Sequence, residues 1–182
     1  MATGEYNSVL KFLAKFLGLY VVLNVAYGLI IEFYSPGYDP FTWLVTQHVV
    51  FFLSQIDSTV SMLALPVSAS IKVLKDSKTV ISVYEGCNSI NVMIVYVSFL
   101  FSFTGPLKKT LQFFVLGIVV IYVMNLLRVI LLYEVALFFP HNLYFFHKYF
   151  FTGIIYAVVF LLWYIWIKQV TKRESGTAAT QG

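Results

Sequence analysis

Charged residues are scarce in this sequence. Only 11% of its 182 residues are Asp, Glu, Lys or Arg, while 60% are hydrophobic and 19% are aromatic; soluble domains have about 25% charged residues. A soluble fold of this length exposes a large share of its atoms and could not remove this much apolar area from water. The composition therefore predicts one integral membrane domain over residues 1–173, in contact with the lipid bilayer, and a disordered tail over residues 174–182.

Cysteine is nearly absent as well, since Cys87 is the only one in the chain. A single thiol excludes an intrachain disulfide, a CxxC metal site and an iron–sulfur cluster, and we predict neither a metal nor another cofactor. The net charge of +4 does not indicate a nucleic-acid partner, because the basic residues lie at the ends of apolar runs rather than on a polar face.

Four apolar runs have the length and composition of membrane-spanning helices: residues 12–33, 88–104, 110–133 and 150–167. The third run continues to residue 138, so we expect its C-terminal part to project beyond the hydrocarbon. With four spans, the basic residues that flank them all lie on one side, which the positive-inside rule makes cytoplasmic. We therefore predict a multi-pass membrane protein with both its N-terminus and its C-terminus in the cytoplasm.

The segment between the first two spans is predicted to lie outside the cytoplasm. In residues 43–65, polar residues interrupt an apolar stretch at near-helical spacing, which is typical of an amphipathic helix at the membrane interface. Counting this stretch as a fifth span would put Lys108, Lys109 and the basic C-terminus outside. Farther on, short alternating segments flank residues 75–78 and predict a β-hairpin. The expected fold is an all-α integral membrane protein, a four-helix transmembrane bundle with an extracytoplasmic amphipathic helix and a small β-hairpin between helices one and two.

Three polar residues are predicted to share one depth: Cys87, Arg128 and His147. Each lies about 20 residues from a predicted cytoplasmic lysine, or about 30 Å along a helix, which equals the hydrocarbon thickness of about 30 Å. A thiolate is a strong nucleophile that a nearby cation favours, and the N-terminus of the second span would favour it too. Histidine can exchange the protons of acyl transfer, and arginine can stabilise a thiolate or an oxyanion. The three residues form a candidate cysteine acyl-transfer site, in which Asn125 shares the face of Arg128 and could orient it.

Each of these residues also has a simpler interpretation. A lone cysteine in a membrane helix usually serves packing, Arg128 could reach the phosphates of the outer lipids, and His147 could be an ordinary interfacial residue. The other two histidines serve as comparisons for His147. His48 lies on the amphipathic stretch and His141 in a loop after Pro140, and we interpret both as structural.

The motifs around the three residues resemble those of one membrane enzyme family. The turn Glu85-Gly86-Cys87-Asn88 resembles the cysteine motif of the exosortase/archaeosortase family, residues 125–128 resemble its arginine motif, and His147 with Gly153 resembles its histidine motif. The short chain, the segment 35–40 and the Glu-Gly-Cys-Asn form are most similar to the XrtF-type branch. Many exosortases carry Cys-Ser-Gly where this chain has Cys-Asn-Ser, so the role of the residues after the cysteine stays open.

The resemblance implies a cysteine peptidase/transpeptidase of the bacterial inner membrane, of the hydrolase class, with its active site on the periplasmic side. Cys87 would attack the scissile carbonyl, Arg128 would stabilise the thiolate or oxyanion, and His147 would handle the proton. The implied partner is the C-terminal sorting-signal helix of a secreted protein, and the acceptor is unknown. The supporting positions are Glu85, Asn88 and Asn125.

Other functions compete with this one. A non-catalytic membrane scaffold or assembly partner would use the same residues to hold helices together. A transporter or channel component would need polar residues along a path through the bilayer, but the inner halves of spans two to four have almost none. A phosphatase or lipid-modifying enzyme would have only one arginine and one histidine near the outer face to bind phosphate.

Overall fold

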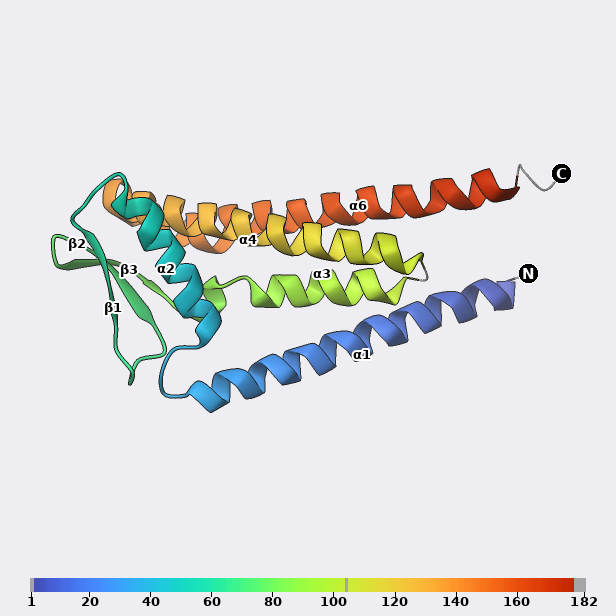
Figure 1. The fold of residues 1–182 in the computed structure, drawn as a ribbon, viewed down its shortest axis with the longest axis horizontal. Coiled ribbons are helices and arrows are strands. Elements are labelled where there is room, and N and C mark those ends of the chain that lie inside the picture. The colour runs from blue at the N-terminus through green and yellow to red at the C-terminus, as the bar shows by residue number, and fades with distance from the viewer. Residues whose placement is uncertain (1, 104, 179–182) are drawn as a thin grey trace.

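Four helices run side by side along most of the length of the protein, in a computed structural model that describes residues 2–103 and 105–178. Figure 1 shows both termini at one end of this bundle and a small sheet at the other end. A further helix, α2, crosses the bundle beside the sheet. The bundle consists of three long helices, α1 (Ala2–Tyr34), α4 (Leu107–Phe138) and α6 (Phe151–Ala178), and the shorter α3 (Ile90–Ser102).

Within the described residues, three helical segments are long and apolar enough to cross a membrane: Tyr6–Tyr34, Leu107–Phe138 and Pro140–Gln169. They confirm that the chain is a membrane protein. The remaining helix of the bundle, α3, has 13 residues and would span only about 20 Å at 1.5 Å per residue. The count of four spans therefore stays a prediction, as do the sides of the membrane on which the termini and the sheet lie.

The second helix, α2 (Pro40–Ser54), is shorter than the helix expected over residues 43–65. Asp39 caps its N-terminus by accepting hydrogen bonds from the backbone N–H groups of Phe41 and Thr42, at 2.9 and 3.0 Å. The expectation of a helix beyond Ser54 is wrong, because the chain turns there and Val60–Ala64 forms strand β1. Five residues of strand are stabilised by pairing with a neighbour rather than by local preference, which a periodicity argument cannot detect.

The predicted hairpin is present and belongs to a three-stranded antiparallel sheet in the order β1-β2-β3. Strands β2 (Ile71–Lys75) and β3 (Lys78–Val83) are joined at Asp76 and Ser77, which have φ values of 48° and 63°. Two successive positive φ values are the signature of the hairpin turn that matches the twist of antiparallel strands. Strand β1 pairs with the other side of β2, so β3 is an edge strand.

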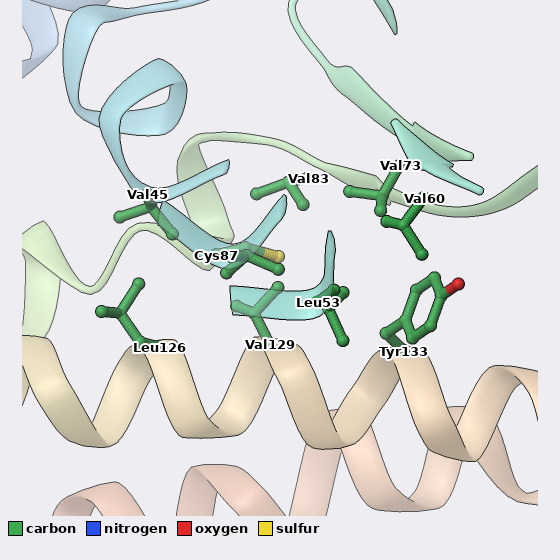
Figure 2. Packing of buried hydrophobic residues seen from close by; sticks show 10 residues of the cluster. Val45, Leu53, Val60, Val73, Val83, Cys87, Leu126, Val129 and Tyr133 are labelled. Atoms are coloured by element: carbon green, nitrogen blue, oxygen red, sulfur yellow. The ribbon is translucent and has the colours of Figure 1, made fainter. Parts of the chain in front are cut away.

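The sheet lies against α2 and the C-terminal half of α4 over a small apolar core. Figure 2 shows this core, in which Val83 and the Cys87 side chain face Val129 of α4. Helix α4 has 32 residues and is about 48 Å long, which exceeds the hydrocarbon thickness of about 30 Å; the projection of its C-terminal part beyond the bilayer stays a prediction. The core residues are Val45, Val49, Leu53, Val60, Val73, Val83, Cys87, Leu126, Val129 and Tyr133.

After α4 the chain turns through three short helical segments before α6. A 3-10 turn (Pro140–Asn142), a single α-helical turn (Leu143–Phe145) and a π-helical turn (Phe146–Phe150) follow each other. The last helix, α6, continues to Ala178 and so enters the segment 174–182 for which disorder is predicted; residues 179–182 lie outside the described residues.

Candidate active site

Cys87 lies in a tight turn between strand β3 and helix α3. A 3-10 turn over Glu85–Cys87 follows the strand, and the Cys87 backbone N–H donates to the Tyr84 carbonyl at 2.7 Å. Ser89 then adopts a left-handed φ of 63° and precedes the first residue of α3, Ile90. The second span was expected to begin at residue 88 and to present its positive end to the thiol. Because Asn88 and Ser89 lie between Cys87 and the first residue of α3, Cys87 is outside the first turn of α3 and gains little from the helix dipole, which acts over one turn.

Helix α4 holds the cysteine turn in place through Asn125. The Asn125 Nδ2 donates a hydrogen bond of 2.8 Å to the Cys87 carbonyl oxygen, and both residues are buried. We expected Asn125 to orient Arg128, but its hydrogen bond goes to the cysteine backbone instead. Asn125 therefore supports the backbone of Cys87 directly, whereas the sequence indicated support through Arg128.

Arg128 and His147 are in contact with each other. The Arg128 Nη2 lies 3.5 Å from the His147 Nδ1. A guanidinium can only donate hydrogen bonds, so Nδ1 accepts here and the proton of a neutral ring is on Nε2. The backbone of His147 lies in the π-helical turn, and its carbonyl accepts a bond of 3.1 Å from the Thr152 hydroxyl. Short π-helical segments are frequent at functional sites.

An open cavity of about 430 Å³ connects the cysteine to the histidine. Cys87 and His147 both line it, together with residues of β3 and α4. Arg128 is 9% exposed, and its Nε is buried with no hydrogen-bond partner among the described residues. The structure thus brings together the three residues expected to share one depth, from a turn, a helix and a π-helical segment that are far apart in the sequence.

The surroundings of the thiol oppose its ionisation. Burial raises the pKa of the Cys87 thiol above its ordinary value. Hydrogen bonding with the backbone of Tyr84 and the positive charge of Arg128 both lower this pKa. The nearby negative charge of Glu85 raises the same pKa slightly. Cys87 is therefore a protonated thiol at rest, and Arg128 is the charge that favours the thiolate.

Tyr84 is a site residue that the sequence reasoning missed. Its side chain lies close enough to Cys87 for the two groups to affect each other's ionisation, and a thiolate at Cys87 would be the main cause that raises the pKa of the Tyr84 phenol. The ring lies over Gly86, since a Cβ atom at Gly86 would be 2.5 Å from Tyr84 Cε2. An aromatic residue two positions before the glycine of the cysteine motif was the only signal in the sequence.

Asn88 points away from the thiol and joins three segments of the fold. Its Nδ2 donates to the Tyr27 hydroxyl of α1 at 2.7 Å and lies 3.4 Å from Asp39 Oδ1 and 3.3 Å from Thr42 Oγ1. Its Oδ1 accepts from the Ile90 N–H at 3.0 Å. With an exposure of 1%, Asn88 supports the site by fixing the turn that follows Cys87.

The two comparison histidines do not reach the cysteine. His48 Nδ1 lies 2.6 Å from the Tyr122 hydroxyl, which links α2 to α4, and His141 is exposed in the turn before the π-helical segment. Glu85 is half-buried, and its described effect on the site is electrostatic. Among the described residues, no three His, Cys, Asp or Glu side chains come together as metal ligands.

Comparison with known proteins identifies a family. The family model of the transmembrane exosortases matches residues 7–166. No curated protein and no solved structure shows significant similarity. The match covers most of α1, all of α4, the N-terminal half of α6, the sheet and all the residues of the cavity, so this membrane protein belongs to the transmembrane exosortase family.

Proposed function

We propose that the protein is a membrane cysteine protease-transpeptidase that cleaves the C-terminal sorting signals of secreted proteins near the outer face of the bacterial inner membrane. The observation that carries this proposal is the open cavity that Cys87 and His147 both line, with Arg128 in contact with His147. Membership in the exosortase family supports a transpeptidase-like role. The assignment to the XrtF-type branch rests on the short chain, the segment 35–40 and the Glu-Gly-Cys-Asn turn, and it is part of the proposal.

The first half of the reaction forms an acyl-enzyme. The thiol proton of Cys87 moves to a ring nitrogen of His147, and the sulfur attacks the scissile carbonyl carbon of the substrate. The carbon–sulfur bond forms, the carbon–nitrogen bond breaks, and His147 returns the proton to the leaving amine. In the second half, a nucleophile of the acceptor, or water, gives a proton to the same ring and displaces the sulfur, which regenerates the thiol.

Arg128 acts on both groups that carry the proton, the His147 ring and the Cys87 thiol. In the structure its guanidinium occupies the lone pair of His147 Nδ1, and its charge also favours a thiolate at Cys87. As negative charge develops on the sulfur or on the carbonyl oxygen, the guanidinium is drawn towards it and releases Nδ1 to take the proton. The buried Arg128 Nε, which has no described partner, is a further donor available to that negative charge.

The proposed location at the outer face follows from the chain ends. Figure 1 shows the sheet at the end of the bundle opposite both termini, and the cysteine turn directly follows strand β3 of this sheet. The positive-inside rule assigns the termini, with their basic residues, to the cytoplasm. A substrate that is itself anchored by a C-terminal transmembrane helix would then present the segment just outside the bilayer to Cys87.

Cleavage of a reporter in cells tests this function. The reporter is a secreted domain that carries a candidate sorting tail, and its processing is measured with wild-type protein, Cys87→Ser and the matched exposed change Ser61→Ala on β1. We expect Cys87→Ser to abolish processing while its amount in the membrane stays equal to wild type. Undiminished processing by Cys87→Ser would favour the alternative of a non-catalytic scaffold, which the hydrogen bonds that tie Asn88 to two helices would also serve.

A further inference from the structure

Strand β3 has one edge that no described strand covers. The strand order is β1-β2-β3, and all ladder pairs of β3 are with β2. Among the described residues, no backbone hydrogen bond outside the helices and the sheet involves residues 79–83. In an antiparallel pair, alternate residues point both their N–H and their C=O away from the partner strand. The outer edge of β3 therefore presents unpaired donors and acceptors.

The same edge forms one wall of the cavity at the active site. Six consecutive residues, 79–84, line this cavity. Successive side chains of a strand point to opposite faces of the sheet, so a space that touches every one of them runs along the edge of the strand rather than over one face. The free hydrogen-bonding groups of β3 thus face into the cavity.

The edge leads directly to the nucleophile. Strand β3 ends at Val83, and the 3-10 turn that follows it ends at Cys87. Cys87 lines the same cavity as Thr79, at the far end of the strand. A chain lying in extended conformation along β3 would therefore bring one of its peptide bonds to the sulfur.

The opposite wall determines what kind of chain fits. It is formed by Val129, Leu132, Leu143 and Tyr144, and no charged residue of the described chain lines the cavity. Side chains of an added strand point alternately to the two sides. An uncharged peptide with apolar side chains at alternate positions matches this wall, whereas a helix would leave the edge of β3 unpaired.

We propose that the substrate segment upstream of the scissile bond binds as an additional β-strand on the outer edge of β3, with alternate side chains against Val129, Leu132 and Leu143. This inference rests on the proposed function, because Cys87 is taken as the nucleophile. Recognition then has two components: main-chain hydrogen bonds that require an extended backbone, and an apolar wall that selects side chains at every second position.

Backbone methylation of a reactive peptide tests the inference. The probes are a panel of N-acetyl pentapeptides with apolar residues at alternate positions and a C-terminal vinyl sulfone. The Cys87 thiol adds to the vinyl group, so that a carbon–sulfur bond forms and the thiol proton ends on the adjacent carbon. The labelling rate of the full chain in lipid nanodiscs is measured by mass spectrometry for each probe and for versions methylated at one amide nitrogen at a time.

The expected result is a pattern with a period of two residues. Methylation of every second amide should slow labelling about tenfold, the effect of one lost main-chain hydrogen bond, and methylation of the amides between them should change it less than twofold. A uniform effect of methylation, or labelling no faster than by ethyl vinyl sulfone, which has no peptide, would overturn the inference. Reporter cleavage that depends on Cys87 would leave the proposed function intact in either case.

A matched pair of variants provides the second readout. Leu143→Trp fills the cavity at its apolar wall, while Leu131→Trp places the same ring on an exposed position of α4 that lines no described cavity. We expect Leu143→Trp to slow labelling by the best pentapeptide at least tenfold and to leave alkylation by iodoacetamide within threefold of wild type. Equal labelling of both variants by the pentapeptide would overturn the proposed site.

Discussion

The Asn125 side chain donates a hydrogen bond of 2.8 Å to the Cys87 carbonyl oxygen, so that helix α4 holds the backbone of the turn that carries the thiol. Arg128 lies on the same helix, about one turn farther on, and contacts His147. One rigid helix thus positions both the nucleophile and the cation. Such support from a regular element is what keeps reactive groups within catalytic distance.

Removal of the Asn125 amide should loosen the cysteine turn. In Asn125→Ala, the buried carbonyl of Cys87 loses its partner, which costs about 1–3 kcal/mol. We expect thermal unfolding in detergent at a lower temperature and reporter processing well below wild type. Gln112→Ala, at an exposed position of the same helix, is the control and should change neither; equal behaviour of the two variants would contradict the supporting role.

A side chain at Gly86 should displace Tyr84. The added Cβ of Gly86→Ala would lie 2.5 Å from Tyr84 Cε2, closer than van der Waals contact permits, and such overpacking typically costs about 1–3 kcal/mol. Processing should fall with stability. In the double variant Tyr84→Ala, Gly86→Ala the clash is gone, so we expect recovery of the unfolding temperature, though not of activity, because the Tyr84 phenol that acts on the ionisation of Cys87 is still missing. Failure of the double variant to recover stability would show that the clash is not the cause.

Loss of the charge at Arg128 should make the thiol harder to ionise. Burial raises the pKa of Cys87 and Arg128 lowers it, so the midpoint of alkylation by iodoacetamide should move to higher pH in Arg128→Met. Arg128→Lys keeps a positive charge and should give a midpoint between those of Arg128→Met and wild type. A midpoint in Arg128→Met equal to or below that of wild type would show that the guanidinium does not act on the sulfur.

Removal of the Asn88 side chain should destabilise the protein more than removal of an asparagine side chain that bonds only within its own helix. Asn88→Ala leaves the Tyr27 hydroxyl and the Ile90 N–H without their described partner, and we expect a loss of about 1–3 kcal/mol in unfolding free energy. Asn24→Ala is the matched control, because the Asn24 amide donates only to the Tyr20 carbonyl of its own helix and is exposed. Its effect should be below about 0.5 kcal/mol. Comparable losses for the two variants would refute the structural role of Asn88.

Features set by local sequence could be predicted well. Apolar runs revealed the long helices, alternation around residues 75–78 revealed the hairpin, and counting along helices from the lysines brought Cys87, Arg128 and His147 to one end of the protein. These inferences depend only on periodicity and on the fixed rise of a helix.

Features set by contacts between distant segments could not be predicted. Strand β1 exists because Val60–Ala64 pairs with β2, and the partners of Asn88 come from α1 and from the cap of α2. The 3-10 turn that ends at Cys87 has no periodic signature in three residues. The role of Tyr84 depends on the space above Gly86, which only coordinates reveal.

A trapped acyl-enzyme is the most direct test of the central claim that Cys87 is the nucleophile. The full chain is mixed with a sorting-tail reporter that it processes, quenched in acid, and searched by mass spectrometry for the Cys87 peptide carrying the upstream fragment of the reporter as a thioester that hydroxylamine removes. We predict this adduct in the wild type and none in Cys87→Ser. Continued processing by Cys87→Ser, or an acyl group found on another residue, would contradict the account.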